Sequence, residues 1–353
     1  MKQKRLREFG IEIGELEPGM KNSISDVEGV TVGHTTLSKG DIQTGVTAIL
    51  PHQGNLFQEK LIASSYVLNG FGKTMGTIQL NELGTIETPI VLTNTLSIGT
   101  AADAVIDYML EHNPEIGRTT GTVNPVIGEC NDMFLNDIRG RNVREKHIRD
   151  AIANATPTFE EGSVGAGTGM LCYSLKGGIG TSSRKMKLKY DTYTIGVLVV
   201  TNFGILRDLR VNGKAVGKEL KDSLLQSWEE KDKGSVMIIV ATDLPVSERQ
   251  LQRIIKRAST GLARTGSIMT TGSGEIILGF STANKVPHQY TSNTLSMDTI
   301  HEEEIDTAFR AVGEATEEAV LNSLVTATHV VGRDGNERPA LSDLLNQFDI
   351  TLS

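Results

Sequence analysis

An apolar run at residues 236–241 begins directly after a charged stretch that ends at Gly234. Four residues of the run are β-branched, which predicts a short strand buried on both faces. Ser235 is its first residue, and Gly234 before it allows backbone conformations that favour a strained peptide bond. Ser235 is therefore either a nucleophile released by cleavage after Gly234 or an ordinary residue between loop and strand. The stretch alone favours the ordinary junction.

Helical spacing of apolar residues appears elsewhere along the chain. Ser247 and Gln250 form a capping-box pattern, and the apolar residues that follow predict a helix that ends at Gly261. Similar spacing predicts helices over 99–112, 139–155, 302–324 and 339–348. Runs rich in β-branched residues predict strands at 24–27, 30–32, 44–50, 89–95 and 194–201. The polar segment 207–233 is expected to be an exposed connector.

Composition narrows the class of protein. The chain has 353 residues, enough for one large domain or two. A formal net charge of -8 argues against a nucleic-acid partner, and no apolar run is long enough to cross a membrane. The start of the sequence has no apolar signal region, and two distant cysteines do not predict a disulfide framework. We expect a cytoplasmic enzyme or binding protein.

Several polar residues next to predicted strands are candidates for chemistry. Ser273 and Glu275 are two residues apart at the start of a strand, so their side chains should share one face. Asn202 ends another strand and could donate to an oxyanion, and Glu129 could bind an ammonium group. Taken singly, each stretch fits a polar turn at least as well.

Cofactor patterns are incomplete in this sequence. The glycine-rich loop 162–170 has Met170 where a dinucleotide-binding pattern needs glycine, and no Gly-Lys-Ser/Thr closes a phosphate loop. We interpret it as a loop that approaches other backbone closely. The seven histidines show no zinc-binding spacing, so neither a metal nor another cofactor is predicted.

Seven stretches are spread over nearly the whole chain: residues 22–34, 44–47, 89–95, 162–170, 202–204, 234–235 and 261–266. Together and in this order they resemble the L-aminopeptidase D-amidase/D-esterase family, which includes the β-peptidyl aminopeptidases. The resemblance implies an α/β fold, a four-layer α/β/β/α sandwich of the type shared with ornithine acetyltransferases. It also implies a single domain, 1–353, that cleaves itself into associated chains 1–234 and 235–353.

The resemblance also implies roles for particular residues. Ser235 matches the family's nucleophile, Ser273 and Glu275 its hydroxyl–carboxylate pair, and Asn202 its oxyanion amide. Glu129 matches the carboxylate that holds the substrate's free amine. Some members have an aromatic residue two places after that glutamate, where this chain has Asn131, so the amine pocket should differ in shape.

The function expected from these parts is that of a self-processing aminopeptidase. Ser235 attacks the Gly234 carbonyl, and the freed α-amine, with an ordinary pKa of about 7.7 to 8.0, then serves as the base. Substrates would be small peptides, amino-acid amides or esters, β-peptides among them, and the enzyme a homo-oligomer, a tetramer of two-chain units. Two alternatives remain: an acyltransferase of the ornithine acetyltransferase type, which uses threonine as nucleophile, and a non-catalytic ligand-binding member of the fold.

Overall fold

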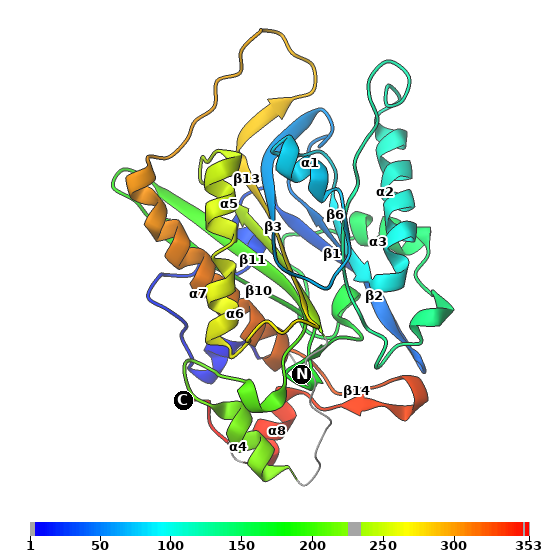
Figure 1. Cartoon of the computed structure of the whole chain (residues 1–353), viewed down its shortest axis with the longest axis vertical. Coiled ribbons are helices and arrows are strands. Elements are labelled where there is room, and N and C mark those ends of the chain that lie inside the picture. The colour runs from blue at the N-terminus through cyan, green and yellow to red at the C-terminus, as the bar shows by residue number, and fades with distance from the viewer. Residues whose placement is uncertain (1–3, 225–233, 349, 353) are drawn as a thin grey trace.

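Two β-sheets pack face to face, and helices cover their outer faces (Figure 1). The computed structural model describes residues 4–224, 234–348 and 350–352. Helices α5 (Glu248–Ile255), α6 (Ala258–Arg264) and α7 (Ile305–Val325) lie on one side, and α2 (Ile98–His112) and α3 (Glu145–Ala153) on the other. The order of layers is therefore helix, sheet, sheet, helix, and the predicted α/β/β/α sandwich is confirmed.

In the described part of the chain, sheet A has five strands and sheet B has six. Sheet A consists, in spatial order, of β1 (Thr31–Lys39), β2 (Ile42–Leu50), β6 (Ile90–Asn94), β7 (Val126–Cys130) and β4 (Thr74–Met75). Sheet B consists of β10 (Ile179–Lys187), β11 (Thr192–Asn202), β12 (Ser235–Thr242), β13 (Gly274–Pro287), β3 (Glu59–Gly70) and β5 (Thr85–Ile86). The parallel pair β12 and β13 thus lies between β11 and β3, which both come earlier in the chain.

Smaller elements complete the fold. They are the helices α1 (Thr77–Glu82), α4 (Val216–Ser223) and α8 (Leu341–Phe348), the ribbon of β8 (Leu171–Cys172) and β9 (Leu175–Lys176), and the ribbon of β14 (Val330–Val331) and β15 (Glu337–Arg338). Within residues 4–224, 234–348 and 350–352, no helix combines the length and apolar character needed to span a bilayer.

The strand predicted at 236–241 is β12, and all its residues are buried. Because side chains alternate along a strand, Val236 and Ile238 join the core under α5, α6 and α7, whereas Met237 and Ile239 join the core between the sheets. A strand with cores on both faces needs an apolar residue at nearly every position. The unbroken apolar run therefore follows from the central place of β12 in sheet B.

The capping box at Ser247 is confirmed, but the helix end predicted at Gly261 is wrong. The Ser247 hydroxyl accepts a hydrogen bond from the Gln250 N–H at 3.2 Å, and the Gln250 side chain accepts one from the Ser247 N–H at 3.2 Å. Gly261 lies inside α6, where an added Cβ would be 2.5 Å from the carbonyl oxygen of Gly313 in α7. This glycine lets two helices pack closely instead of ending one of them.

Two further predictions fail in part. Residues 24–27 are not a strand, because Ile24–Asp26 forms a 3₁₀ turn whose Asp26 carboxylate accepts from the Ser23 N–H at 3.0 Å. The predicted connector 207–233 is not wholly exposed, since α4 buries Val216 and Leu220 in the core under α7. Its residues 225–233 lie outside the described part of the chain.

The glycine-rich loop 162–170 approaches neighbouring backbone closely, as predicted. An added Cβ at Gly169 would lie 2.1 Å from the carbonyl oxygen of Gln43 in β2. One at Gly167 would lie 2.5 Å from the main-chain nitrogen of Ile179 in β10. The loop therefore joins β2 of sheet A to β10, an edge strand of sheet B.

Candidate active site

Three strand ends of sheet B meet at Ser235. This first residue of β12 pairs with Asn202, the last residue of β11, and with Gly274, the first residue of β13. Ser273 and Glu275 flank Gly274, so the pairing brings both next to the start of β12. The side chains of Ser235, Ser273 and Glu275 are all buried. Residues that are about 30 to 70 positions apart in sequence thus form one polar cluster.

Gly234 is required for space and not for an unusual backbone angle. A Cβ at this position would lie 1.7 Å from the carbonyl oxygen of Asn202, a clash that no rotamer relieves. Its φ lies outside the left-handed region, so the special backbone conformation expected from the sequence is not found. The Gly234 carbonyl oxygen accepts a hydrogen bond from the Gly274 N–H at 3.1 Å. The peptide group before Ser235 is therefore held by both neighbouring strands.

The hydroxyl of Ser235 and the carboxylate of Glu275 belong to different faces of sheet B. Ser235 alternates with Val236, so it shares the face of Met237, between the two sheets. Glu275 is the register partner of Val236 and shares its face, toward the helices. Ser273 lies just before the first residue of β13, at the strand end. Glu275 can therefore meet the start of β12 only around that end.

Two hydroxyls of this cluster have unused hydrogen-bonding capacity. Among the described residues, Oγ of Ser235 and Oγ of Ser273 have no hydrogen-bond partner of normal geometry. Leaving a buried hydroxyl unpaired costs about 1 to 3 kcal/mol. A fold that retains such groups has them available for another molecule or for a chemical step.

The amide of Asn202 has a fixed orientation. Its Oδ1 accepts from the Leu171 N–H at 3.0 Å, and its Nδ2 donates to the Asn131 carbonyl oxygen at 3.1 Å. Because a main-chain N–H only donates and a carbonyl only accepts, the amide cannot be turned round without losing both bonds. Asn131 contributes through its main chain, since its own side chain is exposed and accepts from the Met133 N–H at 3.0 Å.

Glu129 lies on β7 of sheet A and is only 4% exposed, so the alternative of a solvated turn is wrong. One carboxylate oxygen accepts from the Lys73 N–H at 3.0 Å, and the other accepts from the Thr95 hydroxyl. Both donors are neutral, and no ion pair to Glu129 is found within the described ranges. A buried carboxylate held only by neutral donors can still bind a cation.

The carboxylate is also close to β13. A Cβ on Gly72 would lie 3.8 Å from Oε1 of Glu129 and 3.8 Å from Cα of Gly274. Gly72 therefore lies between the Glu129 carboxylate and Gly274, the register partner of Ser235, and is close to both. The sequence did not indicate Lys73, Gly72 or Thr95, since all three contribute through the main chain or as an ordinary hydroxyl.

Two further titratable groups line the same corner. Burial raises the pKa of the Cys130 thiol and the Glu129 carboxylate raises it further, while the Ser235 hydroxyl lies close enough to lower it without a hydrogen bond of normal geometry. Burial also raises the pKa of Asp132 to about 7, although its Oδ1 accepts from Nδ2 of Asn136 at 2.9 Å. No group of three metal-ligating side chains occurs within the ranges that the structure describes.

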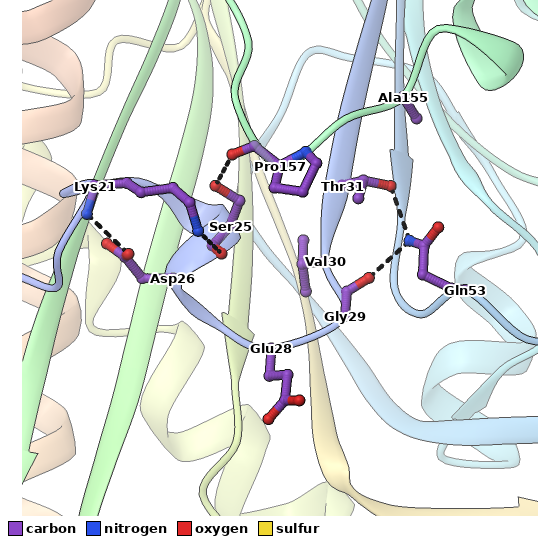
Figure 2. A pocket seen from close by; sticks show the side chains of 10 residues that line it. All are labelled: Lys21, Ser25, Asp26, Glu28, Gly29, Val30, Thr31, Gln53, Ala155 and Pro157. Atoms are coloured by element: carbon purple, nitrogen blue, oxygen red, sulfur yellow. Dashed lines mark hydrogen bonds between the residues drawn. The ribbon is translucent and has the colours of Figure 1, made fainter.

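A cavity of about 480 Å³ lies elsewhere, and Figure 2 shows its lining. None of the site residues above lines it. Its polar groups bind one another: Gln53 Nε2 donates to the Gly29 carbonyl at 2.9 Å, and Ser25 Oγ donates to the Pro157 carbonyl at 2.6 Å. This cavity is therefore separate from the cluster at Ser235.

The model of peptidase family S58 matches residues 22–338. β-Peptidyl aminopeptidase BapA of Sphingosinicella microcystinivorans is 36% identical over 353 residues, covering 94% of this chain and 88% of that protein. The crystal structure of the PH0078 protein from Pyrococcus horikoshii OT3 is similar with a TM-score of 0.92 and 48% identity, over 98% of this chain and 99% of that one. L-aminopeptidase D-Ala-esterase/amidase from Ochrobactrum anthropi, a variant of the Ntn hydrolase fold, has a TM-score of 0.90 and 33% identity, over 99% of both chains.

Proposed function

The chain belongs to peptidase family S58 and is an N-terminal-nucleophile aminopeptidase, and we propose that cleavage after Gly234 turns Ser235 into its nucleophile. The cleavage divides one domain, 1–353, into chains 1–234 and 235–353. The observation that carries the proposal is the place of Ser235 itself. Its buried, unpaired hydroxyl opens a central strand directly after a glycine whose carbonyl is already hydrogen-bonded.

Processing begins with attack of Ser235 Oγ on the carbonyl carbon of Gly234. The new C–O bond replaces the C–N bond, and the hydroxyl proton ends on the freed nitrogen. Water then hydrolyses the ester and releases the carboxyl group of Gly234. The Gly274 N–H, 3.1 Å from the Gly234 oxygen, is in place to stabilise the negative charge that develops there.

In turnover the α-amine of Ser235 takes the proton of its own hydroxyl. An ordinary α-amine has a pKa of about 7.7 to 8.0, so part of it is a free base near neutral pH. Glu275 lies on the other face from the hydroxyl and Ser273 lies at the strand end, and we assign both to the amine there. Nδ2 of Asn202 is the side-chain donor for the oxyanion of the substrate, through the N–H that does not bond to the Asn131 carbonyl.

Its substrates are peptides or amides, and we assign recognition of their free amine to Glu129. An ammonium group that enters a partly dry pocket loses hydration, and a carboxylate at contact distance offsets that loss. Glu129 suits this task because its present hydrogen-bond donors are neutral. Asn131 borders the pocket through its main chain.

Apolar side chains stand exposed beside these residues: Phe71 is 63% exposed, Leu96 47% and Met133 51%. Phe71 precedes Gly72, Leu96 follows Thr95, and Met133 lies two residues after Asn131. Exposed apolar groups around a polar site favour substrates with apolar side chains. β-Peptides are included among the candidates because of the likeness to β-peptidyl aminopeptidase. An acyltransferase function is not favoured, since the named relatives are aminopeptidases.

We further propose a cytoplasmic homo-oligomer, a tetramer of two-chain units. Both cysteines are buried thiols outside any disulfide, which suits a reducing compartment. The tetramer rests on the family resemblance alone. Light scattering coupled to size exclusion would test it.

Intact-mass measurement tests the proposed processing. Wild-type protein should give two chains of about 25 and 13 kDa if its 38.1 kDa is shared by length, while Ser235→Ala should remain whole. A wild-type chain that stays at 38.1 kDa after long incubation would contradict self-cleavage. Kinetics on an amino-acid amide and its N-acetyl derivative test the aminopeptidase assignment separately, because only the free amine should be turned over efficiently.

A further inference from the structure

Lys176 is a fully buried lysine whose ammonium group binds only main-chain oxygens. It ends β9, and its Nζ donates to the carbonyls of Gly167 at 2.9 Å, Met170 at 3.1 Å and Gly177 at 2.7 Å. An ammonium has three N–H donors, so these acceptors use all of them. In the part of the chain that the structure describes, no carboxylate pairs with it. Burial lowers the pKa of Lys176 to about 7, whereas the three carbonyl acceptors favour its charged form.

One of those three carbonyls leads directly to the candidate active site. The Met170 carbonyl and the Leu171 N–H belong to the same peptide group. On one side that group accepts from Lys176 Nζ at 3.1 Å and from the Gly177 N–H at 2.9 Å, and on the other it donates to Oδ1 of Asn202 at 3.0 Å. A cation at the oxygen of a peptide polarises it and strengthens its N–H as a donor.

The Asn202 amide in turn faces the nucleophile. Asn202 and Ser235 are register partners on adjacent strands, so their side chains share the face of sheet B toward sheet A. With Oδ1 held by Leu171, Nδ2 is the end of the amide that points to the Asn131 carbonyl, next in sequence to Cys130 beside Ser235.

We propose that Lys176 is a positioning residue for turnover, because its cation holds the peptide between Met170 and Leu171 and thereby keeps Nδ2 of Asn202 directed toward the oxyanion position. The inference rests on the proposed role of Asn202. Other bonds hold the same ribbon without Lys176: the Tyr173 N–H donates to the Phe203 carbonyl at 2.7 Å, and the Thr201 N–H donates to the Gly178 carbonyl at 3.0 Å. Loss of the cation should therefore disturb the orientation of the Asn202 amide more than it lowers the stability of the fold.

The test is a double-mutant cycle on processed enzyme, with an amino-acid amide as substrate. Lys176→Met should lower kcat by about tenfold or more and change KM by less than about twofold, because the ground-state contacts to the substrate remain. In an Asn202→Ala background the same substitution should change kcat by less than about twofold. Lys176→Arg, which keeps a cation, should recover part of the loss.

Lys214→Met is the matched control, since Lys214 also donates to a main-chain carbonyl, that of Thr351 at 2.8 Å, but far from this amide in the chain. It should leave kcat unchanged. If Lys176→Met fails to fold, Lys176→Gln, which keeps two N–H donors without the charge, carries the same cycle.

Equal losses of kcat in the wild-type and Asn202→Ala backgrounds would overturn the positioning role while leaving the proposed function standing. An unchanged kcat in Lys176→Met would overturn it as well. If Asn202→Ala itself keeps the wild-type kcat, the oxyanion assignment fails, and the role of Lys176 fails with it.

Discussion

Two buried polar clusters of this protein differ in how far their hydrogen-bonding and charge capacity is used. In the α7 ion network, made of Arg7, Arg184, Glu314 and Glu318, the fully buried Arg184 guanidinium lies 2.7 Å from Oε2 of Glu318 and 3.3 Å from Oε2 of Glu314. At the Ser235 site, two hydroxyls are unpaired and Glu129 accepts from neutral donors only. The first cluster has little left to bind, whereas the second has capacity for a substrate.

The α7 ion network shows what a structural cluster requires. Burial raises the pKa of Glu318, but Arg184 and Arg7 more than offset this and hold it below the usual value. Glu314 also accepts from the N–H groups of Glu15 and Leu16, each at 3.1 Å. The network joins residues on both sides of Ser235, so it would connect the two chains after cleavage.

The largest expected effect on activity comes from removing the polar groups beside Ser235. Ser273→Ala and Glu275→Gln should each slow processing and turnover by about 10² to 10⁴-fold, the usual contribution of a proton-transfer group, with circular dichroism unchanged. Cleavage time courses and kcat measure this. Ser267→Ala is a matched control, because that buried serine already accepts from the Met269 N–H at 3.3 Å. Wild-type rates in either of the first two variants would end the role assigned to that residue.

Breaking the α7 ion network should instead affect stability. Arg184→Met leaves two buried carboxylates without their shared cation, and we expect a loss of about 3 to 5 kcal/mol in unfolding free energy. Denaturant unfolding measures it, and kcat per folded molecule should stay near wild type. Adding Glu318→Gln should recover part of the loss. A variant as stable as wild type would show that the network is not what holds α7 in place.

A smaller effect on activity is expected at Glu129. Removing one partner of a buried charge pair costs about 2 to 5 kcal/mol, so Glu129→Gln or N-acetylation of the substrate should each lower kcat/KM more than tenfold. The two losses should not add, since both remove one interaction. Glu161→Gln is the contrasting variant: that buried carboxylate is already paired with Arg5 at 2.6 Å, so its loss should alter stability and not kcat/KM. Additive losses would contradict the assignment of Glu129 to the amine.

The smallest expected effect is a change in the pH dependence of stability at Asp132. Its pKa of about 7 in the folded protein, against an ordinary 3.8, means that the folded state keeps a proton that the unfolded state has lost. Its contribution to stability is therefore full below pH 3.8 and is lost as the pH rises to about 7. Between pH 5 and pH 8 the Tm of Asp132→Asn should fall less than that of wild type. The exposed Asp41→Asn should behave like wild type, and an equal fall in Asp132→Asn would contradict the assignment.

Local patterns predicted the elements better than they predicted the site. The run at 236–241 and the capping box at Ser247 depend on neighbours in sequence, and both are found as expected. The meeting of Ser235 with Asn202 and Gly274 depends instead on the order and register of distant strands, which periodicity does not determine. The resemblance to a family assigned those roles, and the residues taken singly could not.

Other features had either no signal in the sequence or an ambiguous one. Lysine is almost never fully buried, so nothing in the sequence indicated that Lys176 lies inside the protein. The sequence predicts a helix end at Gly261, but glycine is favoured both at helix ends and at close helix contacts. Only the position of α7 against α6 distinguishes the two cases.

The position of β12 and β13 inside sheet B also determines whether the protein assembles in a unimolecular or a bimolecular reaction. Both strands follow residue 234, and their outer neighbours β11 and β3 precede it. An intact chain closes this sheet in a unimolecular step, whereas two separate chains would have to find each other at a rate that falls with dilution. A cut made after folding therefore converts a concentration-independent folding equilibrium into a dimer-like one. From then on, the working lifetime of a dilute molecule is governed by how slowly it unfolds.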